Sequence, residues 1–532
     1  MPRRVPTGPA RPSIPYASPE VAWTAAAVFL VALAIYVRTM LPATSFWDTA
    51  EAQTVPPTLS IFHPTGFPTY TLVGWLWSRL PVGDVIAWRM NLLSGVSVAA
   101  AAGLVVLIVG QLVEERHRVT VAAAAGIGGL AFAFASEPWR NAVRADVHAL
   151  HVFIAALLVW LLVSWASARR AGSPRADRWL LAAALIFGLG MGNHPLTGLM
   201  AAGIGAWLIA VDPGIWRRWR LMLGCALLLA VGMSVYAYIA IRALTPPEPP
   251  LFYARPTTFE RFRYLVFAEQ FRDLFRPFDA PLADLGFKWT DAERVLERQL
   301  IGPGWLLAGV GAAVLAARRF RALVFLGLLV AGNVLYSMNF RDGDIDRYYL
   351  LTVGVGAILL GVALSALGGA AGRAFADASR RALGIVGRRR AAVGAVALVM
   401  LMAALLPLGS LVTMYRERDR SNDRDAERWV AAVHEALPPE AVIISWWSYS
   451  TPLWYHRWIV GERPDVKIID QRNILDDGYG TIHRAVAAHL GRRPVYIVPA
   501  SWELNGILAR WETEPIQTYP GYSELLRVVG PR

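Results

Sequence analysis

The sequence predicts an α-helical polytopic membrane protein with a small α/β domain toward its carboxyl end. Of its 532 residues, 55% are hydrophobic and only 17% are charged, and the mean hydropathy is +0.41. Soluble enzymes are usually less apolar than this. The hydrophobic residues also gather in long charge-free runs, whereas the segment after Tyr415 alternates short apolar stretches with helical ones.

The charge pattern and the cysteine content each exclude another class of protein. The net charge of +13 does not indicate nucleic-acid binding, because the basic residues form short clusters between the apolar runs. Such clusters are typical topology signals of membrane proteins. The single cysteine, Cys225, lies inside an apolar run, which excludes a disulfide framework and a cysteine metal site. We expect no nucleic-acid partner and no cofactor, and nothing in the sequence demands a metal.

The apolar runs predict about eleven transmembrane helices. Residues 1–19 are basic and rich in proline, so we expect a disordered cytoplasmic tail there. No clean cleavage site follows the run Val21–Val37, which favours a retained helix over a signal peptide. The run at 179–211 is too long for one crossing and breaks at Gly192–Pro195, so it counts as two helices. The other runs lie at about 90–113, 119–136, 147–168, 221–241, 301–317, 322–340, 348–372 and 391–415.

The orientation follows from the basic clusters, which fall in alternate loops on the side of the N-terminus. Because basic loops stay inside, an odd number of helices places the C-terminus outside. We expect a transmembrane domain over 20–415, with outer segments at 42–84 and 244–300, in a bacterial inner membrane. The clusters are Arg116 with Arg118, Arg169 to Arg178, Arg217 to Arg220, Arg318 to Arg321, and Arg373 to Arg390.

Residues 416–532 predict a small extracytoplasmic α/β domain. Ala441–Trp446, Val466–Asp470 and Val495–Pro499 are apolar enough for short strands, and helical stretches separate them. This alternation favours a mainly parallel sheet. An aromatic group that includes Trp446 and Tyr449 follows the first strand. Burial in a small core explains it most simply, but aromatic faces also suit sugars, so we hypothesise that both residues help to seat an acceptor.

The first outer segment contains the strongest candidate catalytic residues, Asp48 and Glu51. Carboxylates in so apolar a protein are costly unless they line a watery cavity or act in chemistry. The two are three residues apart, so one helical turn places both on one face. Such a carboxylate can take a proton from an acceptor hydroxyl. The same spacing also fits a capping box, in which Asp48 caps a short helix.

Several outer-side cations are candidate phosphate ligands, and each has a structural alternative. His63, in the rigid turn His63–Pro68, either donates to a phosphate or is a structural loop residue. Arg89 either pairs with a lipid phosphate or carboxylate or extends to the headgroups. Arg140 and Arg144 are four residues apart, so one helical face can present two guanidiniums to a phosphate, or both can pair with nearby acids.

Three further polar features also fall on the predicted outer side. His194 lies where the two helices of the 179–211 run meet, and Arg242 ends the seventh predicted span. The loop Arg341–Arg347 contains an Asp-Gly-Asp-Ile-Asp run, which matches a calcium loop only weakly because the later Glu ligand is missing. No single motif is specific. Their gathering on one side of the membrane indicates a functional site there.

Three short motifs in the first hundred residues resemble a known family. They are an Asp-x-x-Glu pair at Asp48 and Glu51, a His-Pro-x-Gly-Phe-Pro turn at His63–Pro68, and Arg-x-Asn-Leu-Leu-Ser at Arg89–Ser94. Together they resemble the N-terminal signature of membrane proteins related to protein O-mannosyltransferases, a family long labelled as a domain of unknown function. The similarity extends over most of the chain. This chain has Asp146-Val147-His148 where many members have Glu-Val-Tyr.

The resemblance implies a GT-C-type membrane glycosyltransferase. It would move a hexose, mannose-like or other, from a polyprenyl-phosphate carrier to a protein, glycan or lipid hydroxyl on the outer face, with inversion. Asp48 would be the general base, and Glu51 would position the acceptor or orient the cations. His63, Arg89, Arg140, Arg144, His194 and Arg242 would hold the lipid phosphate. The alternative from another class is a transporter, flippase or non-catalytic binder of a lipid-linked sugar.

Overall fold

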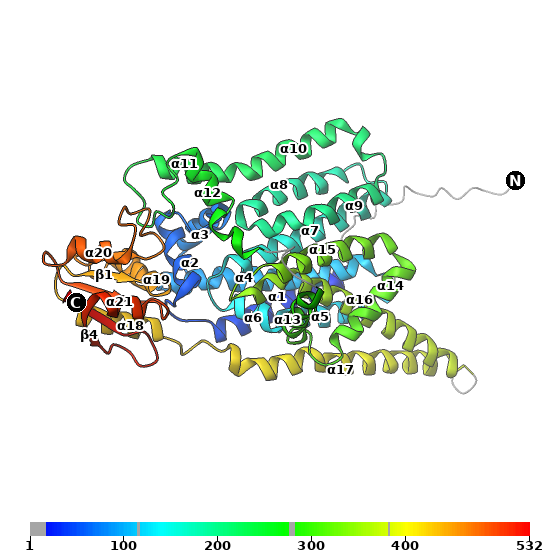
Figure 1. Ribbon diagram of the computed structural model, residues 1–532. Helices are drawn as coiled ribbons and strands as arrows, with labels where there is room; N and C mark the ends of the chain where they lie inside the picture. The colour runs from blue at the N-terminus through cyan, green and yellow to red at the C-terminus, as the bar shows by residue number, and fades with distance from the viewer. Residues whose placement is uncertain (1–17, 114–116, 276–281, 381–383) are drawn as a thin grey trace.

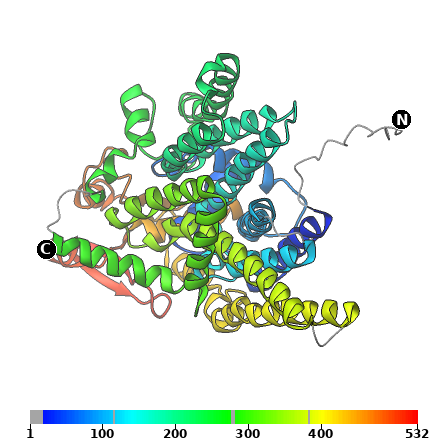
Figure 2. The ribbon, with the colours of Figure 1, turned by 90° about the vertical axis from the view of Figure 1, so that its right-hand side faces the viewer.

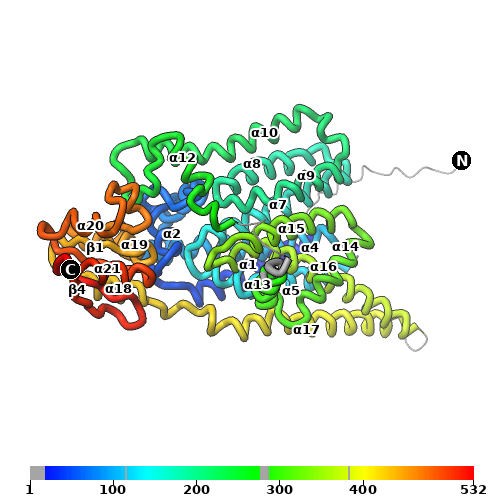
Figure 3. The backbone as a smooth tube through the Cα atoms, in the orientation of Figure 1, coloured from blue at the N-terminus to red at the C-terminus, as the bar shows by residue number. Residues whose placement is uncertain are grey.

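Most of the chain forms a bundle of apolar helices, and a small sheet domain lies at one end of it (Figure 1). The computed structural model describes residues 18–113, 117–275, 282–380 and 384–532. The predicted N-terminal tail therefore lies almost wholly outside the described residues. Figure 2 shows the bundle from the end opposite the sheet domain, and Figure 3 traces the path of the backbone.

Every predicted apolar run forms a helix. Within the described ranges, seven helical segments are long and apolar enough to cross a membrane, or eight if α5 continues into α6 (Ser136–Ala142) across a bend of 66°. The predicted total of about eleven transmembrane helices is reached only if the shorter helices α8, α9 and α14 also cross the membrane. The helices are α1 (Pro19–Thr39), α4 (Ile86–Leu112), α5 (Arg118–Ala133), α7 (Val147–Arg170), α8 (Asp177–Asn193), α9 (Ala201–Val211), α10 (Trp219–Met233), α14 (Gly304–Arg318), α15 (Phe320–Asn339), α16 (Leu350–Ala378) and α17 (Ile385–Arg418).

Glycines bring two of these helices into direct backbone contact. A methyl group on Gly188 of α8 would lie 2.3 Å from the carbonyl oxygen of Leu229, and one on Gly232 would lie 2.5 Å from that of Leu185. Only glycine fits at both positions, so α8 and α10 pack closer than larger residues allow. Small residues serve this purpose widely in membrane helix pairs.

The end of the bundle next to the sheet domain, which the sequence predicts to face outward, is built from short helices and turns. α2 (Trp47–Thr58) and α3 (Pro68–Ser78) form the first outer segment, and α11 (Ala237–Leu244), α12 (Phe259–Val266) and α13 (Leu282–Glu297) belong to later ones. The predicted break in the 179–211 run is present, because α8 ends at Asn193 and a 3-10 turn begins at Pro195. His194 is therefore the corner residue between the two helices.

The structure confirms the three predicted strands as parallel and contains two further strands, β4 and β5. The strand order is β2-β1-β3-β5-β4, with β1 parallel to β2 and β3, and with β5 antiparallel to β3 and β4. β4 is an edge strand with two exposed glutamates, which explains why hydrophobic patterning missed it. The elements are α18 (Asp425–Ala436), β1 (Val442–Ser445), α19 (Trp447–Tyr455), β2 (Lys467–Asp470), α20 (Ile482–His489), β3 (Val495–Val498), α21 (Leu504–Arg510), β4 (Trp511–Ile516) and β5 (Leu525–Pro531).

The sheet domain rests on the first outer segment (Figure 1). Phe46, which precedes α2, stacks on Tyr522 with ring centroids 4.8 Å apart and meets the edge of Tyr449 at 5.7 Å. The backbone N–H of Ala87 donates to the hydroxyl of Tyr455 at 3.0 Å. These contacts fix the domain against α2 and the start of α4.

Candidate active site

Asp48 and Glu51 lie in the first turn and a half of α2, as the spacing predicts, but they do not form a capping box. The N-cap residue is Phe46, and no side chain caps this helix. The structural alternative for Asp48 is therefore wrong. Glu51 is buried, whereas the side chain of Asp48 remains 29% exposed. Asp48 is the carboxylate that can meet a ligand.

Glu51 holds the His63 turn in place. One carboxylate oxygen accepts from the backbone N–H of His63 at 2.9 Å, and the other lies 2.5 Å from its ring Nδ1. Gly66 closes the turn by donating to the carbonyl of His63, with a φ of +82° that glycine tolerates. Burial would lower the pKa of His63, but Glu51 and Asp48 outweigh it and raise the pKa above its usual value. Glu51 therefore favours the protonated form of this imidazole.

Asp48 forms an ion pair with Arg347, a residue that sequence reasoning did not select. Asp48 Oδ2 lies 2.8 Å from Arg347 Nη2, and the guanidinium is buried. Burial would raise the pKa of Asp48, but Arg347 and His63 outweigh it and lower the pKa below its usual value. Asp48 therefore stays ionised at neutral pH. In the described part of the chain, no hydrogen bond reaches its other oxygen, Oδ1.

The acidic loop before α16 is a centre of ion pairs. Asp344 lies 2.5 Å from Arg140, 3.1 Å from Arg144 and 3.7 Å from Arg347. Burial would raise the pKa of Asp344, but the three guanidiniums, led by that of Arg347, lower it to about 2. Asp146 lies 3.6 Å from both Arg144 and Arg347. Arg140 also lies 2.7 Å from Glu137, so the ion pairs that were the alternative for Arg140 and Arg144 are present.

Arg89 and Arg242, also predicted as phosphate ligands, hold loop backbone together. Each guanidinium donates to three carbonyl oxygens, which gives both residues a structural explanation within the chain. The acceptors are Ser78, Val82 and Gly83 for Arg89, and Leu59, Thr245 and Pro247 for Arg242.

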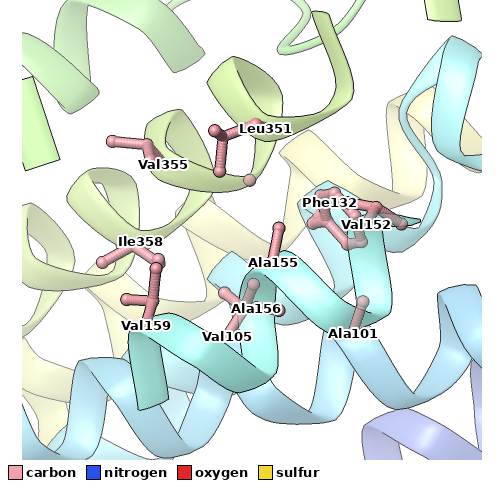
Figure 4. A pocket seen from close by; sticks show the side chains of 11 residues that line it. Ala101, Val105, Phe132, Val152, Ala155, Ala156, Val159, Leu351, Val355 and Ile358 are labelled. Atoms are coloured by element: carbon pink, nitrogen blue, oxygen red, sulfur yellow. The ribbon is translucent and has the colours of Figure 1, made fainter. Parts of the chain in front are cut away.

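His194 belongs to a buried group of aromatic and imidazole rings, which includes His148, His151 and Phe67. Its ring centroid lies 4.5 Å from that of His148 and 5.7 Å from that of His151, and it stacks on Phe67. Val152, which follows His151 on α7, lines a small cavity with Leu351 and other apolar residues (Figure 4).

The third motif, Arg-x-Asn-Leu-Leu-Ser, ties the outer loops to each other. Asn91 donates to the carbonyl of Leu41 at 2.8 Å, and its Oδ1 accepts from the backbone N–H of Ala145 at 2.7 Å. Ser94 accepts from the backbone N–H of Asp146 at 3.0 Å. The motif therefore sets the position of Asp146, and through it that of Arg347.

Asp48, Glu51 and His63 form the one group in the described residues whose ligand atoms are close enough to hold a metal ion, within 4.8 Å of one another. Their present contacts fit a metal poorly. The short bond between Glu51 and His63 contains a proton that a metal would displace, and Arg347 already neutralises Asp48.

The aromatic group of the sheet domain lies beside this site. Trp446 and Tyr449 are both half-buried, and Tyr449 touches Phe46 of the first outer segment. Trp447, between them, is buried, and its ring centroid lies 5.6 Å from that of His63 and 6.1 Å from that of the exposed Trp47. The carboxyl end of β1 therefore borders the candidate active site.

Residues 48–216 match the family model described as "Protein O-mannosyl-transferase TMEM260 N-terminal domain". Protein O-mannosyl-transferase TMEM260 of Mus musculus is 25% identical over 482 residues, which are 85% of this chain and 63% of the mouse protein. Protein O-mannosyl-transferase tmem260 of Dictyostelium discoideum is 21% identical over 225 residues, which are 40% of this chain and 27% of that protein. The chain spans less than two thirds of the length of either relative.

Two crystal structures of ArnT from Cupriavidus metallidurans share the fold at 14% sequence identity. The apo state has a TM-score of 0.59 and covers 94% of this chain and 97% of that one. The form bound to undecaprenyl phosphate has a TM-score of 0.57 and covers 96% and 98%. These comparisons confirm the predicted resemblance to a GT-C, O-mannosyltransferase-like family and the predicted fold class, an integral membrane helical bundle with a small C-terminal sheet domain.

The contact between Glu51 and His63 predicts a pH-dependent loss of stability in Glu51→Gln. Because the pKa of His63 is higher in the folded state, this contact stabilises the fold fully below about pH 6.5 and less as pH rises through the folded pKa. We expect the variant to lose about 1–3 kcal/mol of unfolding free energy in mild acid. The difference from the wild type should shrink in mild base.

Unfolding of the detergent-solubilised protein, followed across this pH range, measures the effect. Glu435→Gln is the matched control, because Glu435 is exposed on α18 and no described contact engages it. A difference that is independent of pH would contradict the proposed protonation of His63.

Proposed function

We propose that this chain is an inverting membrane glycosyltransferase. It transfers a hexose, such as mannose, from a polyprenyl-phosphate carrier to an acceptor hydroxyl. The names of the curated relatives and the undecaprenyl phosphate in a structure of the same fold support this class of reaction. The observation on which it rests most is the ionised, partly exposed Asp48 in the first outer segment, held by Arg347 and bordered by His63.

In the proposed reaction the acceptor hydroxyl donates a hydrogen bond to Asp48 Oδ1, the oxygen opposite the Arg347 contact. The hydroxyl oxygen attacks the anomeric carbon while the carbon–oxygen bond to the phosphate breaks on the opposite face. The proton passes to Asp48, and the products are an inverted glycoside and polyprenyl phosphate. A carboxylate with a low pKa is a weak base, so the proton moves late, after bond formation has made the hydroxyl acidic.

Fixed positive charge stabilises the phosphate as it leaves. His63 is the nearest predicted phosphate ligand to Asp48, and Arg140 and Arg144 lie beyond Arg347 at the same end of the bundle. A preorganised cation in a site with little water lowers the energy of charge that develops in the transition state. Phosphate is a good leaving group, so the reaction needs no general acid. Glu51 acts by orienting His63.

The acceptor of this proposal is a protein hydroxyl, by analogy with the named relatives, and a glycan or lipid hydroxyl is the alternative. The sheet domain borders the site through Trp446, Trp447 and Tyr449, so it is the part of the chain that meets the acceptor. The site opens to the extracytoplasmic face, because the basic loops lie at the opposite end of the bundle.

Asp48→Asn tests the general base. The amide keeps the shape of the side chain but cannot accept the proton, so transfer should fall on the order of a hundredfold to ten-thousandfold. The measurement is transfer of a radiolabelled sugar from its polyprenyl-phosphate carrier, alongside the unfolding temperature.

Asp84→Asn is the control, because Asp84 is an exposed carboxylate of the same outer segment. Near-normal transfer by a stably folded Asp48→Asn protein would falsify the assigned role. Passage of the labelled donor across a vesicle membrane without any product would instead favour a transporter.

The geometry also predicts transfer without a divalent metal. Because Glu51 already bonds to His63 and Arg347 already neutralises Asp48, we expect a chelator to leave the transfer rate unchanged. The assay compares metal-depleted enzyme with enzyme supplied with Mg²⁺ or Mn²⁺. Loss of transfer on chelation, with recovery on adding the cation, would show that Asp48, Glu51 and His63 hold a metal instead.

The proposed orientation predicts the activity of fused reporters. Alkaline phosphatase, which folds only outside the cytoplasm, should be active when joined after Arg532 and inactive when joined in the basic loop between α7 and α8. The opposite pattern would place the candidate active site in the cytoplasm.

A further inference from the structure

The site described so far lacks a cation that is free to meet the donor phosphate. Arg140, Arg144 and Arg347 share the carboxylates of the acidic loop and of Asp146, while Arg89 and Arg242 are bonded to backbone carbonyls. His63 remains, but its charge is balanced by Glu51. A cation without a carboxylate partner in the resting protein can add to the stabilisation of the leaving phosphate without first giving up an ion pair.

The sheet domain supplies such a cation at the ends of its strands, on the side nearest the site. β1, β2 and β3 are parallel and in the order β2-β1-β3, so their carboxyl ends meet along one edge. In open α/β sheets, ligands bind outside the carboxyl ends of the strands, where the strand order reverses. The residues that follow the three strands include Trp446 and Trp447 after β1, Arg472 after β2 and Trp502 after β3.

The guanidinium of Arg472 lies over the ring of Trp447 at this end of the sheet. Its guanidinium carbon is 3.9 Å from the ring centroid of Trp447 and 5.6 Å from that of Trp446. Its backbone N–H donates to Asp470 Oδ1 at 3.0 Å, which fixes the turn after β2. The side chain is half-buried, and across the described ranges no hydrogen bond or ion pair engages its guanidinium.

One indole ring separates Arg472 from the site. Trp447 has Arg472 on its face and His63 against its edge at 5.6 Å, and Asp48 lies beyond His63. The charge of Arg472 reaches this far, because it opposes the rise in the pKa of His63 that Glu51 and Asp48 cause. A guanidinium that lies over an aromatic ring keeps its N–H groups in its own plane, and their outer edge can bind an anion in bidentate fashion.

We propose that Arg472 is a ligand of the phosphate group of the carrier lipid. It would act from the sheet domain while Asp48 acts from the membrane domain, so that the donor bridges the two. This inference rests on the proposed function, because the phosphate that Arg472 would bind belongs to the donor of the proposed reaction. It gives the sheet domain a direct part in donor binding.

The test compares Arg472→Gln and Arg472→Lys with the full-length wild type. The probe is undecaprenyl phosphate in detergent micelles, titrated without sugar or acceptor. We expect Arg472→Gln to bind it on the order of ten- to a hundredfold more weakly and to raise the donor KM to a similar extent. Arg472→Lys should recover part of the affinity, because it keeps the charge but not the bidentate geometry.

The matched control is Arg492→Gln, since Arg492 is exposed in the loop before β3, at the opposite edge of the sheet. Equal unfolding temperatures show that each variant is folded. Wild-type affinity in a folded Arg472→Gln protein, or a rise in the KM of the acceptor alone, overturns the role of Arg472 and leaves the proposed function standing. A wild type that does not bind the probe overturns both.

Discussion

The ion pair between Asp48 and Arg347 joins the first outer segment to the last. A charged side chain at the end of an apolar bundle is stable only where an opposite charge compensates the loss of water. Arg347 meets Asp48, Asp146 and Asp344, which come from three different segments of the chain. Because the buried guanidinium needs these partners, the ion pairs fix the three segments relative to one another. The side chain of Asp48 remains 29% exposed, so a ligand can reach it.

The sequence predicts well those features that depend on neighbouring residues. The long apolar runs, the break before His194, the parallel strands and the pair Asp48 and Glu51 all follow from local spacing. It predicts poorly those features that depend on contacts across the chain. The sequence marks Arg341–Arg347 as an acidic loop, but nothing in it pairs Arg347 with Asp48, which lies far away along the chain. Likewise nothing in the local pattern shows that Arg89 donates to backbone carbonyls.

The site also combines two parts of the chain whose patterns look unrelated. The membrane part supplies the carboxylates and most of the cations, while the sheet part supplies an aromatic edge that contacts His63 through Trp447. Neither part alone surrounds the space beside Asp48. The proposed reaction joins a lipid-linked donor to an acceptor hydroxyl, and a site built between the two parts suits that reaction.

Phe46 shows how firmly the two parts are joined. Its ring enters a cage made by Trp429, Tyr449 and Tyr522, so a residue of the membrane part completes a hydrophobic cluster of the sheet domain. Cut away from the bundle, the sheet domain would present an empty aromatic socket to water. The domain is therefore a poor candidate for expression as a separate fragment. Hinge-like swinging of the domain would also have to extract this ring first, so the contact opposes movement of the sheet domain relative to α2.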